Sequence, residues 1–360
     1  MSVVTKVLTN REGRDRRPGS GRGRVPRRGV LWALAGVLVA GAGGGALAAL
    51  PDGGPGAGPG AGGDARADGA LVLPAPEAVA DLDLPWPTDG QAAVAVAKAG
   101  VLGVKGPQQQ PVPIASVTKV MTAYVVLRDH PLKDGEDGPT ITVDAQAAAE
   151  SVSASESTAP VTEGQRLTQR KLLEVMLLPS ANNVARLLAR WDAGSQEAFV
   201  KRMNAEAARL GMTGTTYTGA SGFEATTVST AADQLKLARE AMKEPALRAT
   251  VALRSTTLPG RAEPLRNTNT LLDRPGVVGL KTGSSTPAGG NLMWALEVPD
   301  GKGGPGRRLV YGVVLGQRAG TTPTEGLRAA LENSGRLVDA LRQKLPGALA
   351  ALDGGQREWA

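Results

Sequence analysis

Apolar residues form two patterns, which divide the folded part of the chain into β-rich ends and a helical middle. In the middle, they recur at the three- and four-residue spacing of amphipathic helices. Near both ends, short runs rich in valine, leucine and alanine lie between turns, as is typical of strands. We therefore expect an α+β domain. The predicted strands are 91–96, 100–104, 277–283, 292–298 and 308–315, and the predicted helices are 171–178, 184–191, 196–210, 230–242 and 323–345.

A further, mostly apolar helix is predicted to begin near Ser116, after Pro113 and a few small residues. Ser116 and Lys119 are three residues apart, so a helix places them on the same face. Burial lowers the pKa of a lysine and so favours its neutral, basic form. The pattern predicts a serine nucleophile activated by a lysine base. A single Ser-x-x-Lys match is weak evidence, because such short patterns also arise by chance.

Composition divides the chain into five segments. Residues 1–28 carry nine basic and two acidic side chains and form a basic cytoplasmic segment. Residues 29–50 lack charged side chains, and 51–84 form a Gly/Pro-rich linker. We expect one folded domain over 85–345 and a frayed tail over 346–360.

The uncharged run 29–50 is long enough to span a bilayer, and the arginines before it would hold the N-terminus in the cytoplasm. It is either a transmembrane signal anchor that stays or a signal peptide cut after the Ala46-x-Ala48 pattern. In both cases the folded domain is expected at the extracytoplasmic face of the membrane, or secreted after cleavage.

The residue content excludes several classes of chemistry. The chain has no cysteine, which excludes disulfides and thiol catalysis, and one histidine, His130, which excludes a histidine-rich metal site. His130 lies in a turn-like segment and is interpreted as a surface residue. The net charge of +7 comes entirely from residues 1–28, because 32 basic and 32 acidic residues balance in the remainder. A neutral body gives no support for nucleic-acid binding.

Three short motifs occur in order along the chain. They are Ser116-Val117-Thr118-Lys119, Ser180-Ala181-Asn182 and Lys281-Thr282-Gly283. Each alone has a simple structural explanation, such as a helix cap at Ser180 or a strand end at Lys281. Their combined order and spacing are far more specific than any one of them.

With these motifs the chain resembles the low-molecular-mass D-alanyl-D-alanine carboxypeptidases of the penicillin-binding protein and serine β-lactamase superfamily, over about residues 86–345. The resemblance is actinobacterial-like and implies a β-lactamase/transpeptidase-like fold. In that fold, helices flank an antiparallel five-stranded sheet and a helical subdomain is present. Supporting matches between the motifs are 199–204, 210–212, 221–223, 229–233 and 267–272.

The resemblance implies a role for each motif residue in releasing the terminal D-alanine. Ser116 would form an acyl-enzyme with Lys119 as base, and Ser180 would pass a proton to the leaving amine. The backbone N–H groups of Ser116 and Ser284 would hold the oxyanion. In the substrate-binding set, Asn182 would hold the peptide backbone.

The third motif completes that set. Lys281 and Thr282 would bind the terminal carboxylate, and Gly283 would let the substrate lie close along the strand. The implied partners are peptidoglycan pentapeptide stems, with β-lactams as inhibitors and the membrane bound through 29–50. No metal and no cofactor are expected.

Two departures from the family pattern concern neighbouring positions. Asn183 stands where many members have aspartate, and Ser284, Ser285 and Thr286 stand where many have an aromatic residue. Neither changes a catalytic atom, but the second affects the preference for substrate side chains.

Two other functions use the same fold. A β-lactamase-like hydrolase needs an additional carboxylate to activate the deacylating water, and no Glu-x-x-Leu-Asn setting follows the second motif. A non-catalytic cell-wall binding module would not need the complete set of motif side chains. Trp191, Trp294 and Tyr124 are interpreted as core residues, and Asp144, Glu150 and Glu156 as a solvated face.

Overall fold

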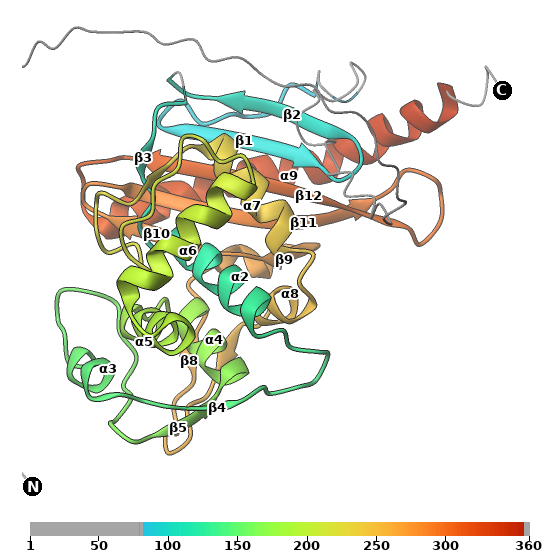
Figure 1. Ribbon diagram of the computed structural model, residues 1–360. Helices are drawn as coiled ribbons and strands as arrows, with labels where there is room; N and C mark the ends of the chain where they lie inside the picture. Colours follow the sequence, from blue (N-terminus) through green and yellow to red (C-terminus); the bar gives the residue numbers. More distant parts are fainter. Residues whose placement is uncertain (1–78, 80–81, 108, 356–360) are drawn as a thin grey trace, which may run out of the picture. The chain divides into compact units, whose positions relative to one another are not determined.

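Strands from both ends of the folded part form one antiparallel sheet (Figure 1). Five strands follow the path β10-β11-β12-β1-β2, and β9 pairs with β11 beside that path. The predicted five-stranded antiparallel sheet is therefore confirmed, except that the predicted strand 277–283 is divided into the short strand β9 and the strand β10. The strands are β1 Gln91–Val96, β2 Gly100–Lys105, β9 Val277–Gly279, β10 Thr282–Ser285, β11 Gly289–Pro299 and β12 Arg307–Gln317.

This computed structural model describes residue 79 and residues 82–107 and 109–355, which belong to one unit. The predicted segments 1–28 and 29–50, and nearly all of the linker 51–84, lie outside the described residues. Among the helices that are described, none has the length and hydropathy of a membrane span.

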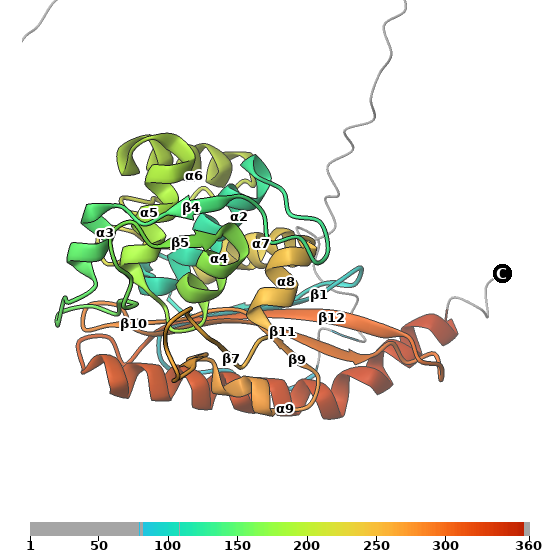
Figure 2. The ribbon, with the colours of Figure 1, turned by 90° about the horizontal axis from the view of Figure 1, so that it is seen from below.

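Helices cover both faces of the sheet (Figure 2). The long C-terminal helix α9 packs on one face, and the helices from the middle of the chain lie on the other. These helices are α2 Lys119–Asp129, α3 Ala145–Glu150, α4 Gln169–Leu177, α5 Asn182–Ala193, α6 Gln196–Arg209, α7 Ala231–Ala241 and α8 Pro245–Val251, and α9 is Pro323–Gly355.

Short elements connect these layers. Two 3₁₀ turns, η2 Ala115–Thr118 and η3 Thr270–Asp273, precede α2 and β9. Three two-stranded sheets pair β3 Val112–Pro113 with β6 Val228–Ser229, β4 Thr140–Thr142 with β5 Arg166–Thr168, and β7 Ser255–Thr256 with β8 Leu265–Arg266.

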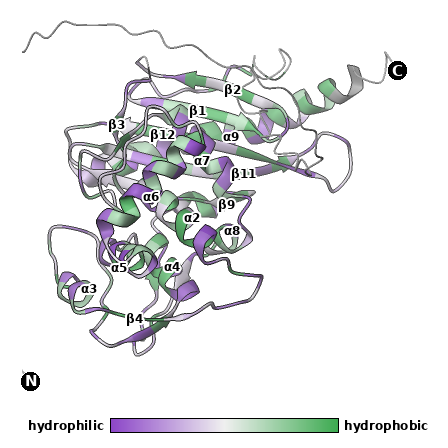
Figure 3. Cartoon of the chain, in the orientation of Figure 1, coloured by the Kyte–Doolittle hydropathy of each residue, from purple (hydrophilic) through white to green (hydrophobic). Residues whose placement is uncertain are grey.

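The alternation of side chains along the strands supplies two separate cores. In β1, Ala93 and Ala95 face the core that contains α2, whereas Ala92, Val94 and Val96 face the core beneath α9. Figure 3 shows mainly hydrophobic residues along α2 and β1, whereas α5 and α6 carry both hydrophobic and hydrophilic residues. The helix α2 is therefore central to its core, and α5 and α6 are amphipathic.

The C-terminal helix is longer than predicted. We expected it to end at residue 345, but α9 continues through Pro346 to Gly355, so residues 346–355 of the predicted frayed tail are helical. Leu345 and Leu349 are fully buried against the sheet. The β11–β12 turn also lies close, because a Cβ on Gly301 would be 2.5 Å from Ala350 N. This packing offsets the hydrogen bond that proline removes.

The predicted core aromatics are mostly confirmed. Trp294 is fully buried and Tyr124 is 4% exposed, whereas Trp191 is only partly buried. Trp191 stacks on His130, with ring centroids 4.1 Å apart.

Candidate active site

Ser116 lies in η2, directly before α2. The predicted helix therefore begins as a 3₁₀ turn and becomes α-helical at Lys119. Ala115 has φ +45°, a left-handed conformation that is uncommon for a residue with a side chain. A Cβ on Gly222 would be 1.9 Å from Ala115 O, so the loop at 222 fits closely against this turn only because residue 222 is glycine. The turn is thus held by its neighbours in a strained conformation.

Lys119 is fully buried and joins three parts of the site. Its Nζ lies 2.8 Å from Ser116 Oγ and 2.5 Å from Asn182 Oδ1, and it donates to Ser221 O at 2.9 Å. The sequence prediction that Ser116 and Lys119 share a helix face is confirmed by this contact. The structure adds Ser221 O as a third partner.

Burial shifts the protonation of Lys119. The pKa of its amine lies well below the usual range, first because burial removes it from water and then because of the positive charges of Lys281 and Arg186. Glu156 and Glu224 act in the opposite direction. The neutral amine, which accepts a proton, is therefore favoured far more than in a solvated lysine.

Ser180 and Asn182 lie where α5 begins. Ser180 is 6% exposed and has φ +70°, and Ala181, not Ser180, is the N-cap residue. Within the part of the chain that is described, no hydrogen bond joins the Ser180 hydroxyl to Ser116 or Lys119. Asn182 Oδ1 accepts from Lys119, and Asn182 Nδ2 donates to Glu156 Oε2 at 2.6 Å.

Lys281 is the second buried lysine, 1% exposed, and it follows Leu280, which has φ +91°. Its Nζ donates to Thr282 O at 2.9 Å. Thr282 Oγ1 lies 2.6 Å from Thr268 Oγ1, so a residue between the second and third motifs also contributes to this corner. Burial alone lowers the pKa of Lys281 to about 7.

Strand β10 lies at one end of the main path through the sheet, and no strand among the described residues pairs with its outer edge, called the free edge below. Lys281 and Met293 exchange two backbone hydrogen bonds. In an antiparallel pair the bonded and non-bonded residues alternate, so Thr282 and Ser284 turn their backbone N–H and C=O groups away from β11. The Ser284 N–H therefore points to the free edge.

Gly283 has a packing role that the sequence did not indicate. A Cβ at this position would lie 2.9 Å from Ser116 N and from Val117 N. The glycine thus lets β10 pack directly against the turn that carries Ser116. Its predicted role, making room for the substrate along the strand, stays a prediction.

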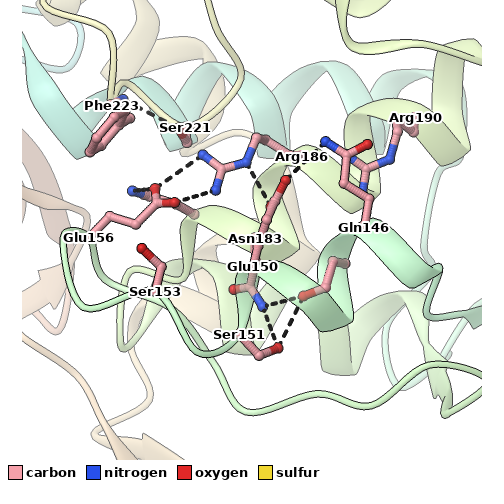
Figure 4. Close-up of polar contacts among 12 residues, drawn as sticks. Gln146, Glu150, Ser151, Ser153, Glu156, Asn183, Arg186, Arg190, Ser221 and Phe223 are labelled. Carbon is pink, nitrogen blue, oxygen red and sulfur yellow. Dashed lines mark hydrogen bonds and ion pairs between the residues drawn. The ribbon is translucent and has the colours of Figure 1, made fainter.

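The prediction of a solvated face at Asp144, Glu150 and Glu156 is wrong for the two glutamates, whose side chains are 19% and 10% exposed and pair with Arg186, whereas the Asp144 side chain is 39% exposed. Glu156 accepts from Arg186 Nη2 at 2.6 Å and from Asn182, while Glu150 accepts from Arg186 Nε at 2.8 Å (Figure 4). Asp144 caps α3 and pairs with Arg190. The sequence carried one available signal, because Arg186 lies on the α5 face four residues after Asn182.

Asn183, one of the departures from the family pattern, is a structural residue. Its Nδ2 donates to Ala147 O and Ala159 O, and its Oδ1 accepts from Ala159 N. The fully buried side chain therefore fixes the loop that carries Glu156 onto α5. An aspartate could not make the same donations.

His130 lies at the opposite end of α2 from the site, where its Nε2 is 3.1 Å from Asp192 Oδ1. An eleven-residue helix is about 16 Å long, so His130 cannot reach Ser116. Lys119 is the base candidate that contacts the serine.

Comparison with known proteins identifies related sequences and structures. Residues 88–300 match the D-alanyl-D-alanine carboxypeptidase family, peptidase S11. The D-alanyl-D-alanine carboxypeptidase DacB2 of Mycobacterium tuberculosis is 34% identical over 210 residues, which are 57% of this chain and 67% of that protein. A D-alanyl-D-alanine endopeptidase of Pseudomonas aeruginosa is 36% identical over 191 residues, 51% of this chain and 58% of that protein.

Solved structures agree with these matches. The Streptomyces K15 DD-transpeptidase has a TM-score of 0.59 and 26% identity, covering 71% of this chain and 98% of that one. Penicillin-binding protein 6B of Escherichia coli has a TM-score of 0.56 and 29% identity, covering 68% and 76%. The chain spans about half to two thirds of the length of the curated relatives named above. The family match covers more than half of the chain, which therefore belongs to the D-alanyl-D-alanine carboxypeptidase family, peptidase S11.

Proposed function

We propose that this chain is a serine-type D-Ala-D-Ala carboxypeptidase. It removes the terminal D-alanine from peptidoglycan stem peptides through an acyl-enzyme on Ser116, and β-lactams inhibit it. The observation that carries the proposal is the contact at 2.8 Å between Ser116 Oγ and the buried amine of Lys119. Family membership supports the same reaction.

Acylation begins with transfer of the Ser116 hydroxyl proton to Lys119. The lowered pKa of Lys119 supports this role, because a neutral amine accepts the proton as the serine oxygen attacks the carbonyl between the two D-alanines. Ser180 then gives its hydroxyl proton to the leaving amine of the terminal D-alanine and takes up the proton that Lys119 had accepted, which leaves Lys119 neutral for deacylation. Water releases the peptide from Ser116, with Lys119 again as the base.

Two backbone N–H groups stabilise the negative oxygen of the tetrahedral intermediate, those of Ser116 and Ser284. Two observations support this pair. The Ser284 N–H points to the free edge of β10, and the close approach at Gly283 brings that strand against the Ser116 backbone.

The substrate's terminal carboxylate binds at Lys281 and Thr282. Support comes from the buried amine of Lys281 and from the hydroxyl pair of Thr282 and Thr268 beside it. Asn182 holds the peptide backbone with the amide hydrogen that Glu156 does not take, since an amide NH₂ has two hydrogens.

The proposal is tested by D-alanine release from a pentapeptide ending in D-Ala-D-Ala. The full chain should release D-alanine, Ser116→Ala should not, and Ser334→Ala should be active, because Ser334 is buried in α9 on the other side of the sheet. Equal release by the wild type and Ser116→Ala would refute the nucleophile. No release by the wild type, with penicillin labelling retained, would favour a binding module on the same fold.

The site supports β-lactam inhibition over β-lactamase activity. Among the described residues, one carboxylate is bonded to the motif residues, that of Glu156, and it is occupied by Arg186 and Asn182. We expect penicillin to leave a stable adduct on Ser116 that is visible in a gel assay. Rapid turnover of penicillin would contradict this expectation.

The place of action follows from the substrate and the N-terminal sequence. Peptidoglycan stems lie outside the cytoplasm, and residues 29–50 hold the domain at the extracytoplasmic face of the membrane. Protease treatment of intact spheroplasts should digest the domain and leave the N-terminal segment. Complete protection would place the domain on the cytoplasmic side.

A further inference from the structure

The carboxylate of Glu156 bonds to Asn182 of the second motif and forms an ion pair with Arg186. Its Oε2 accepts from Asn182 Nδ2 at 2.6 Å, and Arg186 holds both of its carboxylate oxygens, at 2.6 and 3.1 Å. Only 10% of each side chain in this pair is exposed. Arg186 also donates to Glu150 at 2.8 Å, so its guanidinium bridges two carboxylates (Figure 4).

We propose that Glu156, held in place by Arg186, is a positioning residue that orients the side-chain amide of Asn182 towards Lys119. The inference rests on the proposed function and adds a residue to its machinery. Glu156 does not touch Ser116 and acts through Asn182.

The reason lies in the two ends of the amide. An Asn side chain can turn over, which exchanges an acceptor oxygen for a donor nitrogen. Only Oδ1 can accept from the Lys119 amine, which lies 2.5 Å away. An ionised carboxylate accepts only, so Glu156 must face Nδ2 and thereby leaves Oδ1 facing Lys119.

The loop that carries Glu156 is itself tied to α5. Asn182 N donates to Ser157 O at 2.8 Å, and the Asn183 side chain exchanges hydrogen bonds with Ala159. Two consecutive asparagines thus anchor the segment that directly follows Glu156. The carboxylate is held by backbone as well as by Arg186, as a positioning role requires.

The pair also sets the electrostatic surroundings of Lys119. Charged groups face Lys119 from each side: Lys281 from the third motif, Arg186 from α5, Glu156 from the loop before the second motif and Glu224 from the loop after Ser221. Lys281 and Arg186 lower the pKa of Lys119, whereas Glu156 and Glu224 raise it. Removing Glu156 or Arg186 should therefore move the pKa of Lys119 in opposite directions.

The first experiment separates positioning from catalysis by the carboxylate. Glu156→Gln keeps an acceptor for Asn182, whereas Glu156→Leu removes it at similar size. We expect Gln to retain penicillin acylation within about 5-fold and Leu to lose about 10²-fold, the scale of a misplaced catalytic group. Equal losses in acylation or deacylation for both variants would overturn the proposal and make the carboxylate itself catalytic.

The second experiment keeps the proposal testable if Glu156→Leu does not fold. The pKa of Lys119 is read in the full chain by NMR of lysines carrying ¹³C at Cε, with Lys119→Met identifying the signal. Glu156→Gln should lower this pKa and Arg186→Met should raise it. The pH below which the acylation rate falls should shift in the same direction as the pKa of Lys119.

Arg190→Met is the matched control, because Arg190 lies one turn further along α5 and forms a similar ion pair with Asp144. It should shift neither the Lys119 pKa nor the acylation rate. Shifts in the same direction for Glu156→Gln and Arg186→Met, or an equal shift for Arg190→Met, would refute the inference. A wild type without D-alanine release would refute the proposed function alone, since the Lys119 signal is measured without turnover.

Discussion

The two faces of the central sheet are formed by the same strands but differ in the kind of side chain that they bury. Beneath α9, the strands present Leu292, Trp294 and Leu296, all fully buried, to a helix that contributes mainly leucine and alanine. On the opposite face, the core around α2 is interrupted by Lys119 and Lys281, both buried. One face therefore has the composition of an ordinary core, and the other contains charge that burial disfavours.

Backbone strain also occurs at the motifs. Seven residues other than glycine have positive φ among the described residues, and three of them, Ala115, Ser180 and Leu280, lie in or beside the three motifs. Such conformations persist only where surrounding contacts enforce them. The comparison teaches that the α9 face stabilises the fold while the other face uses part of that stability to hold reactive groups.

Lys119→Met has the largest expected effect, because it should separate the stability of the fold from the activity of the site. Methionine fills a similar volume without a base, so folding should be retained or improved, while acylation by penicillin should fall about 10³-fold or more. Stopped-flow acylation together with thermal unfolding measures both. A variant that acylates at the wild-type rate would show that Lys119 is not the base.

Leu341→Ala tests the α9 face. Leu341 is fully buried there, and removing it should cost about 2–5 kcal/mol in the free energy of unfolding. The acylation rate per folded molecule should not change, because Leu341 packs in the core beneath α9, whereas the residues that flank Lys119 pack in the core on the other face. Urea unfolding measures the free energy of unfolding, and the acylation rate is normalised by active-site titration. A lower acylation rate at an unchanged free energy of unfolding would contradict the division between faces.

Gly283→Ala tests the close contact between strand β10 and the turn that carries Ser116. The new Cβ would lie 2.9 Å from Ser116 N and Val117 N, so either β10 or η2 must move. We expect acylation to fall about 10- to 100-fold, because a displacement of this order misaligns the reacting groups. Gly304→Ala is the control, since a Cβ there meets nothing within 4 Å, and equal rates for both variants would refute the close approach.

The smallest expected effect concerns the pH dependence of stability. Burial lowers the folded-state pKa of Lys281 to about 7 from the usual 10.5, so between these values the unfolded chain binds more protons. Stability should therefore rise with pH through this window, and the cost of burying Lys281 is fully present below pH 7. Lys281→Met should reduce the slope by up to about 1.4 kcal/mol per pH unit. Urea unfolding at pH 7.5, 8.5 and 9.5 measures the slope for the wild type and for Lys281→Met. The same slope for both proteins would show that Lys281 keeps its usual pKa.

Local patterns in the sequence were sufficient for most of the fold. The hairpin of β1 and β2, the helices α4 to α7 and the long strands β11 and β12 lie close to their predicted positions, because apolar spacing and turn residues act over a few neighbours. The pairing of Ser116 with Lys119 was predictable for the same reason, since both lie within one helical turn.

Contacts between distant segments were decided only by the tertiary structure. Glu156 lies 26 residues before Asn182, and nothing in its local sequence distinguishes it from a solvated carboxylate. The packing role of Gly283 was not predictable, because the contact of β10 with the Ser116 turn joins segments from opposite ends of the domain. The continuation of α9 past Pro346 likewise depends on burial against the sheet, which outweighs the local preference of proline to end a helix. The sequence by itself determined the three motifs and the pairing of Ser116 with Lys119, because these depend on near neighbours, and long-range packing determined which groups surround and hold these side chains.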